Sequence, residues 1–167
     1  ILRDKIKEGV KAEDYEHPLK GFHIVVDAGN GAGGFYATDV LEPLGADISG
    51  SQFLEPDGMF PNHIPNPENE AAMQSVCLAT VRAKADLGVI FDTDVDRGGA
   101  VDERGDELNR IRLVAVASAI ALEGNPGGTI VTDSITSSGL KEYIEQTLGG
   151  RHHRFKRGYR NVINEAL

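Results

Sequence analysis

Three aspartates in one short segment carry the clearest chemical signal of this sequence. Asp92, Asp94 and Asp96 occupy alternate positions directly after Leu87–Phe91, an apolar run typical of a buried strand. On a straight strand such carboxylates stand roughly 6 to 7 Å apart, so the chain must turn before all three can reach one ion. Because crowded negative charges repel one another unless a cation neutralises them, the segment predicts a Mg²⁺ loop at the carboxyl end of a strand.

Two other interpretations of this acidic segment stay open. The three aspartates and Glu103 fit positions 1, 3, 5 and 12 of an EF-hand loop. Arg97, however, stands where that loop needs glycine, and strands rather than helices are expected on both sides. A solvated acidic turn is the alternative without chemistry, but it does not explain why an apolar strand leads into the triplet.

A glycine-rich turn, Ala28–Gly34, follows the first predicted strand and precedes a predicted helix. Its glycines fit the G-x-G-x-x-G spacing of dinucleotide-binding loops. Asp27 would nevertheless place a carboxylate beside the pyrophosphate, and Glu55 comes too late to bind the ribose. We therefore favour close packing of strand against helix as the role of these glycines.

Three further residues admit both structural and chemical roles. His63 lies in a Pro-rich loop without a second His or Cys at metal-ligand spacing, which favours a structural role. Cys77 falls on the apolar face of a predicted helix and indicates an inert core thiol. Lys156 belongs to the basic cluster Arg151–Arg157, which suits either a solvated edge strand or contact with a phosphate.

Composition limits the class of protein. The chain has 167 residues, a formal net charge of -9 and one cysteine. The acidic balance argues against nucleic-acid binding, and no apolar run approaches the roughly 20 residues that span a bilayer. A single cysteine excludes an intramolecular disulfide and fits a reducing cytoplasm. The first residues resemble neither a signal peptide nor a translation start, so we expect a piece of a longer chain.

The alternation of strand and helix patterns predicts the α/β fold class, with a layered α/β/α domain and a mixed sheet, followed by an incomplete second α/β unit. We expect residues 1–20 to be an irregular linker from a missing first domain, residues 21–109 a metal-binding α/β domain, and residues 110–167 a truncated α/β unit. In the first domain the patterns predict strands over 22–27, 46–53, 87–91 and 99–102, a helix ending at Leu44, and a second helix with its N-cap at Asn66.

The second unit is predicted to contain helices over 112–122 and 138–148, strands over 129–132 and 151–157, and the start of a helix at 161–167. A two-stranded sheet is marginal in water and exposes its edges. We therefore expect this unit to be less ordered than the first or to self-associate.

Several motifs recur together in a characteristic order and spacing: Val25–Gly33, Leu44–Ala46, Phe60–Glu68, Ala85–Gly88 and Asp92–Arg97. Together they closely resemble the second domain of the α-D-phosphohexomutases, the phosphoglucomutase/phosphomannomutase family. The resemblance covers about residues 21–109 and continues more weakly through residues 129–167. The family's acidic loop commonly reads Asp-Gly-Asp-Gly-Asp-Arg, whereas Thr93 and Val95 take the intervening places here, which predicts a stiffer loop.

The resemblance implies a role for each candidate site residue. The three aspartates would hold Mg²⁺, and Arg97 would act as a catalytic residue that steadies a phosphoserine in another domain. Lys156 would reach the phosphate of the sugar, and Arg112 would match an arginine at a domain boundary.

The resemblance also implies the reaction, a transfer of a phosphoryl group between C1 and C6 of a hexose through a bisphosphorylated intermediate. The implied partner is a hexose phosphate, with neither nucleic acid nor membrane. The phosphoserine, the general acid and base, and the hexose-selecting residues have no counterpart here, so we expect this fragment alone to be inactive. The alternative is a stand-alone Mg²⁺- or anion-binding module without catalysis.

Overall fold

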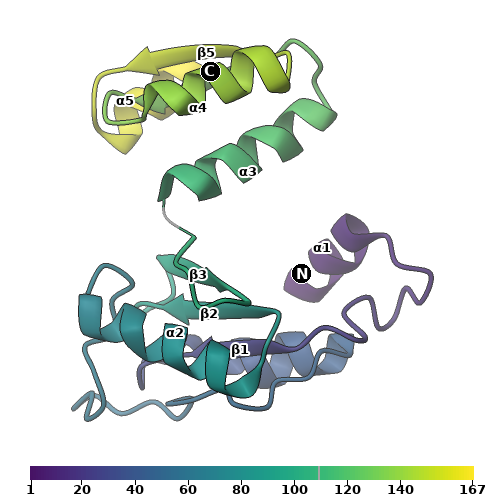
Figure 1. Ribbon diagram of the computed structural model, residues 1–167, viewed down its shortest axis with the longest axis vertical. Coiled ribbons are helices and arrows are strands. Elements are labelled where there is room, and N and C mark those ends of the chain that lie inside the picture. The colour runs from purple at the N-terminus through teal and green to yellow at the C-terminus, as the bar shows by residue number, and fades with distance from the viewer. Residues whose placement is uncertain (109) are drawn as a thin grey trace. The chain divides into compact units, whose positions relative to one another are not determined.

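In the computed structural model the chain forms two compact units, Ile1–Leu108 and Asn109–Leu167. The structure describes residues 1–108 and 110–167, so the boundary predicted near Asn109 falls outside the described residues. Helices accompany a sheet in each unit (Figure 1), and the predicted α/β fold class is confirmed.

A three-stranded mixed sheet forms the centre of the first unit. β1 (Ile24–Asp27) runs parallel to β2 (Leu87–Phe91), and β3 (Gly98–Asp102) returns antiparallel to β2. Asp27 is aligned with Ile90, so the carboxyl ends of the two parallel strands meet at one edge of the sheet. The loop of residues 92–97, which joins β2 to β3, therefore begins at this edge.

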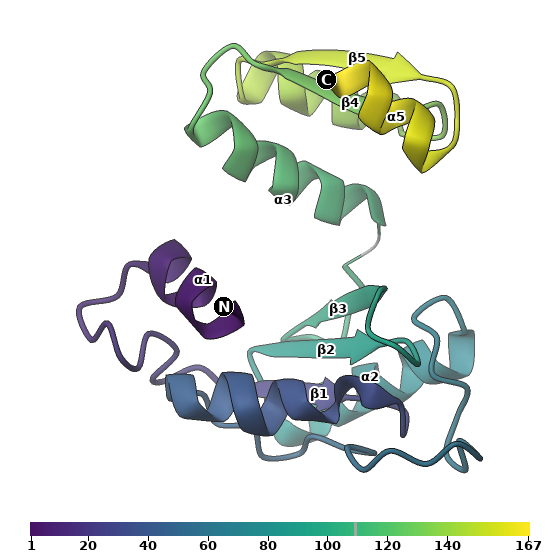
Figure 2. The same ribbon diagram turned by 180° about the vertical axis from the view of Figure 1, so that it is seen from behind.

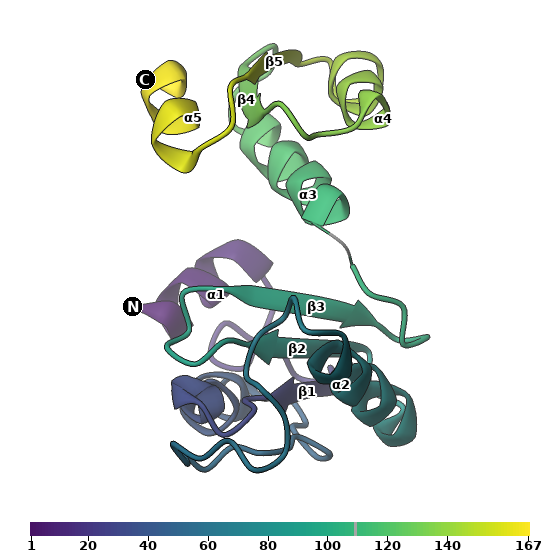
Figure 3. The same ribbon diagram turned by 90° about the vertical axis from the view of Figure 1, so that its left-hand side faces the viewer.

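Helical segments cover both faces of this sheet (Figures 2 and 3). Val25 packs with Ala79 of α2 (Glu70–Ala83), whereas Val26 packs with Val40 and Leu41 of the helical segment on the opposite face. Successive side chains of a strand point to opposite faces, which is why neighbouring valines belong to different clusters. The predicted α/β/α layering follows from this arrangement.

The helical segment before Gly45 differs from the regular helix expected there. It consists of the 3-10 turn η1 (Ala32–Gly34), the π-helical η2 (Tyr36–Leu41) and the 3-10 turn η3 (Glu42–Leu44). Gly45 then ends it at a φ of 92°, in the left-handed region that glycine adopts readily.

The strand expected over residues 46–53 is reduced to two isolated bridges, His23–Asp47 and Asp27–Gln52. Between the two bridges the chain turns at Gly50, whose φ is 84°, and the backbone N–H of Ser51 donates to the carbonyl of Ile48. A turn at this point interrupts the ladder, because a regular strand requires extended backbone throughout.

One helix and one helix boundary also differ from the sequence-based expectation. Leu2–Val10 forms α1 where an irregular linker was expected. α2 is capped by Asn69, whose side-chain oxygen accepts from the backbone N–H of Ala72 at 3.1 Å, so the predicted N-cap at Asn66 is wrong. Asn66 instead accepts from the N–H of Glu68 at 3.0 Å and forms a turn ahead of the helix.

The second unit contains α3 (Arg110–Glu123), β4 (Thr129–Asp133), α4 (Ser138–Glu142) continuing into the π-helical η4 (Tyr143–Thr147), β5 (Arg151–Phe155) and α5 (Tyr159–Ala166). β4 and β5 pair in parallel, and Leu122, Leu140 and Ile144 form a buried core. Within the described ranges, no helix combines the length and the apolar character needed to cross a membrane.

Candidate metal centre

The three aspartates of the first unit converge in the loop between β2 and β3. The N–H of Asp92 donates to the carbonyl of Arg97 at 3.1 Å, which closes the loop. One carboxylate oxygen from each of Asp92, Asp94 and Asp96 lies within 4.8 Å of the other two. Oxygens around one Mg²⁺ at about 2.1 Å can be separated by at most about 4.2 Å, so a small contraction would place all three on one ion. An all-oxygen, all-carboxylate set is the donor chemistry that Mg²⁺ takes in proteins, and the residues therefore fit this ion.

Arg97 holds the buried aspartate of the loop. The side chain of Asp92 is 2% exposed, and its carboxylate accepts from the Arg97 backbone N–H at 3.1 Å and from Nε at 2.9 Å. Burial by itself would raise the pKa of Asp92, but hydrogen bonds from the Arg97 backbone, from Asp96 and from the Arg97 side chain outweigh it and hold that pKa below its ordinary value.

The pKa of Asp96 shifts in the opposite direction to that of Asp92. The Asp96 pKa is raised, first by the hydrogen bond shared with Asp92 and then by repulsion from Asp94 and Asp92. Carboxylates this close compete for a proton, and a bound cation would replace that proton and remove the repulsion. The opposite shifts of the two pKa values follow from the crowding of three carboxylates in one loop.

Val95 adds strain to the same loop. It lies between two of the aspartates with φ at 67°, in the left-handed region that a β-branched residue rarely adopts. A residue in such a region costs of order 1–3 kcal/mol and persists only where its surroundings impose the conformation. The segments packed against the loop must therefore hold it in place.

The glycine-rich turn supplies part of that support. The N–H of Ala32 donates to the carbonyl of Thr93 at 2.9 Å, and a Cβ added at Gly31 would lie 3.0 Å from the same oxygen. At Gly33 an added Cβ would lie 2.9 Å from the ring of Phe91. Gly33 lets the start of the helical segment pack on β2, which agrees with the predicted packing of strand against helix. The close approach of Gly31 to the acidic loop goes beyond that prediction.

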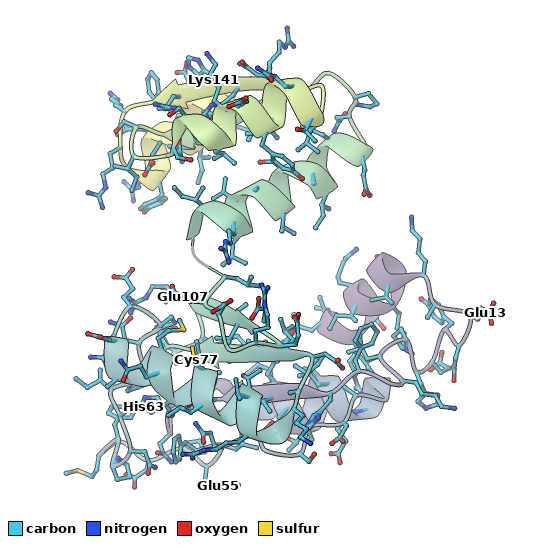
Figure 4. The ribbon with its side chains drawn as sticks, in the orientation of Figure 1. Glu13, Glu55, His63, Cys77, Glu107 and Lys141 are labelled. Atoms are coloured by element: carbon cyan, nitrogen blue, oxygen red, sulfur yellow. The ribbon has the colours of Figure 1, made fainter. Side chains whose placement is uncertain are left out.

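Two contacts around the loop were not expected from the sequence. Nη1 of Arg97 lies 3.4 Å from the side-chain oxygen of Asn66. His63, in the loop before α2 (Figure 4), is 6% exposed and places Nε2 2.9 Å from the carboxylate of Asp27. One feature of the sequence could have indicated the contact of His63. Asp27 is a carboxylate at the end of an apolar strand, and a buried carboxylate requires a hydrogen-bond partner.

The other two candidate site residues belong to the second unit. Lys156 directly follows β5, is exposed, and has Nζ 5.6 Å from the ring centroid of Phe155. Arg112 lies in α3 and is also exposed. Their roles toward a sugar phosphate stay predictions.

Fold and loop together define the class of protein: an α/β domain whose carboxylate-rich hairpin loop suits a divalent cation. Residues 3–105 match the family described as phosphoglucomutase/phosphomannomutase, alpha/beta/alpha domain II. A phosphomannomutase/phosphoglucomutase from Pseudomonas syringae pv. tomato is 37% identical over 142 residues, which cover 85% of this chain and 30% of that protein. The chain belongs to the phosphoglucomutase/phosphomannomutase family, as the motifs predicted.

Solved structures agree with this assignment. A phosphoglucomutase/phosphomannomutase family protein from Burkholderia thailandensis superimposes with a TM-score of 0.80 at 29% identity, over 98% of this chain and 35% of that one. The N-acetylphosphoglucosamine mutase of Aspergillus fumigatus, solved in complex with GlcNAc-6P and magnesium, shares the fold with a TM-score of 0.58 at 17% identity, over 99% of this chain and 33% of that one. The chain thus spans about a third of the length of these relatives.

Proposed function

We propose that this chain supplies the Mg²⁺-binding domain of a phosphohexomutase that, at full length, interconverts hexose 1-phosphate and hexose 6-phosphate. The observation that carries the proposal is the convergence of Asp92, Asp94 and Asp96 in one hairpin loop of the family's second domain. The magnesium in the Aspergillus fumigatus structure supports the choice of ion.

Each residue of the loop has a distinct part in this proposal. The three aspartates bind Mg²⁺, which when bound supplies a Lewis acid that polarises a phosphoryl oxygen. Arg97 is 53% exposed, and its Nε is held by Asp92, so its guanidinium is oriented while still reaching solvent. That orientation suits it to steady a phosphoserine presented by another domain, through charge-assisted hydrogen bonds to phosphate oxygens.

The rest of the proposal concerns the whole protein. The phosphoserine donates its phosphoryl group to one hydroxyl of the hexose phosphate, and the bisphosphorylated intermediate then returns the other phosphoryl group to the serine. Lys156 binds the sugar phosphate, and Arg112 lies at the boundary between domains. Residues 1–20 lead from a preceding domain, and residues 110–167 begin the next one. When alone, residues 110–167 are either less ordered than the first unit or stabilised by association between copies. The protein acts in the cytoplasm on a hexose phosphate, without nucleic acid or membrane.

Titration with Mg²⁺, followed by amide chemical shifts, tests the metal site directly. We expect the amides of Thr93 and Val95 to move, while that of Ile130 in the second unit stays in place. The affinity should be weak, micromolar or poorer, because Mg²⁺ gives up its water reluctantly and the loop offers only three protein ligands. Sub-micromolar affinity, or shifts that bypass the loop, would contradict the proposed site.

A coupled assay with hexose phosphates and a bisphosphate activator tests the division of roles. We expect no turnover by residues 1–167 alone, because the proposed phosphoryl donor belongs to another domain. Turnover by the purified chain would show that the donor lies within it, and the roles assigned here would have to be changed.

A further inference from the structure

Asp27, the last residue of β1, carries a fully buried carboxylate. One of its oxygens accepts from the N–H of Gly29 at 3.0 Å and from Nε2 of His63 at 2.9 Å. The other accepts from Nε2 of Gln52 at 2.7 Å and from Oγ of Ser75 at 2.9 Å. A buried carboxylate is tolerated only when donors replace its water, and here four separate segments provide them.

Several contacts hold the side chain of His63 in place. Its Nδ1 lies 3.1 Å from the carbonyl oxygen of Ile64, so an oxygen atom lies close to each ring nitrogen. The edge of the ring packs on Phe53, with 5.5 Å between ring centroids. A Cβ added at Gly29 would lie 2.8 Å from Cε1 of His63. The imidazole therefore has one position, which ties its loop to the end of β1.

Two segments tied to Asp27 continue to the acidic loop. In the glycine-rich turn the N–H of Gly29 donates to Asp27, and the N–H of Ala32 donates to the carbonyl of Thr93 at 2.9 Å. The loop that contains His63 continues to Asn66, whose side-chain oxygen lies 3.4 Å from Nη1 of Arg97. The Asp27–His63 pair thus anchors the backbone on one side of the acidic loop and the arginine on the other.

We propose that the buried Asp27–His63 pair positions the Mg²⁺ loop, setting the place of Thr93 and of Arg97 without touching the ion. The inference deepens the proposed function and rests on it for the identity of the ligand. Replacing a residue that bonds a metal ligand directly typically changes metal affinity by about 10–100-fold, and here that residue is Arg97, which bonds Asp92. The Asp27–His63 pair lies further from the ligands, so its replacement should change the affinity less. The strained Val95 makes such support necessary, because the loop would otherwise relax.

His63→Ala in the chain of residues 1–167 is the primary test. We expect Mg²⁺ affinity, measured from the amide shift of Asp94, to fall by up to about tenfold, because His63 acts through Asp27 and the segments bound to it rather than on a ligand directly. In the Mg²⁺-free protein the Nε–H of Arg97, now bonded to Asp92, should exchange faster with solvent. His63→Gln retains a side-chain N–H that can donate to Asp27 and should recover most of both properties.

Two further variants serve as controls for the contact with Arg97 and for the loss of a histidine–aspartate pair. Asn66→Ala removes the contact with Arg97 together with the turn bond from the N–H of Glu68, and leaves every contact of Asp27 and His63 in place. It should speed exchange of the Arg97 Nε–H while the amides of Val25 and Val26 stay protected. His17→Ala is the matched control, because it breaks another histidine–aspartate pair of the same unit, 3.2 Å from Asp14, and should change neither property.

The outcomes separate the inference from the proposed function. Unchanged affinity and unchanged Arg97 exchange in His63→Ala would overturn the positioning role. A loss that His63→Gln fails to recover, or that follows general loss of protection at Val25 and Val26, would also overturn it and leave a purely structural pair. If the unaltered chain binds no Mg²⁺, the proposed function fails, whereas exchange at Arg97 still decides whether His63 positions the loop.

Discussion

Gly34→Ala should be among the most destabilising small changes in the first unit, because this glycine touches backbone rather than side chain. An added Cβ would overlap the carbonyl oxygen of Leu54 and lie 2.8 Å from its carbonyl carbon. Contacts of real Cβ atoms stay beyond 3.0 Å, so the chain at Leu54 must shift on the order of 1 Å.

The size of the effect follows from what that shift disturbs. Two backbone hydrogen bonds hold the chain just before Leu54. The N–H of Gln52 donates to the carbonyl of Val26 at 2.9 Å, and the N–H of Asn30 donates to the carbonyl of Phe53 at 2.8 Å. Losing one or two such bonds costs roughly 1 kcal/mol each, and overpacking a core costs roughly 1–3 kcal/mol. We therefore expect the free energy of unfolding of the first unit to fall by about 3 kcal/mol.

Amide exchange of Val25 and Val26 across a urea series measures this change within the first unit. Gly9→Ala is the matched control: nothing lies within 4 Å of its added Cβ, and it sits inside α1, where alanine is favoured by about 0.5–1 kcal/mol. The two glycine substitutions should thus change the free energy of unfolding in opposite directions. A loss below about 1 kcal/mol for Gly34→Ala would refute the view that these glycines serve close packing.

Three other outcomes can be tested in the same chain. Asp94→Asn should weaken Mg²⁺ binding at least about thirtyfold in calorimetry, because a divalent ion and one exposed carboxylate already attract by about 2 kcal/mol at about 4 Å and a direct ligand lies closer. The exposed Asp39→Asn should leave binding unchanged. Ile144→Ala empties a fully buried position and should destabilise the second unit by about 2–5 kcal/mol, seen as faster exchange at Ile130; unchanged exchange would refute this. The pKa of His152 is lowered, first by burial and then by Arg154, so the unfolded chain binds its proton more readily. Stability of the second unit should be complete above about pH 6.5 and decline as the pH falls toward the lowered pKa, and His152→Gln should flatten that dependence in urea titrations at several pH values.

Local pattern alone was enough for the acidic loop and for the two strands that flank it. An apolar run that ends in alternate aspartates and is followed by two glycines describes a strand, a turn and a returning strand, and β2 and β3 lie where that description puts them. The same applies to α2, where Met73 and Val76 recur at helical spacing on the buried face. Such features depend on neighbours within a few residues, which the sequence displays directly.

The contacts beside the acidic loop could be identified only in the tertiary structure. His63 and Asp27 are separated by 36 residues, and Asn66 and Arg97 by 31, so no local period relates them. The sequence suggested Asn66 as a helix cap, yet Asn69 caps α2 and Asn66 contacts Arg97 instead. Likewise residues 46–53 alternate like a strand but turn at Gly50.

The physical reason is the same in each of these cases. An unpaired carboxylate is inexpensive in water and costly in the interior, so Asp27 demands four donors only once the fold has buried it. Two of these donors, Gln52 and His63, reach Asp27 only because their loops pack against the end of β1 in the folded unit. The sequence determined which carboxylates gather in the loop between β2 and β3, and burial determined which side chains surround Asp27 beside it.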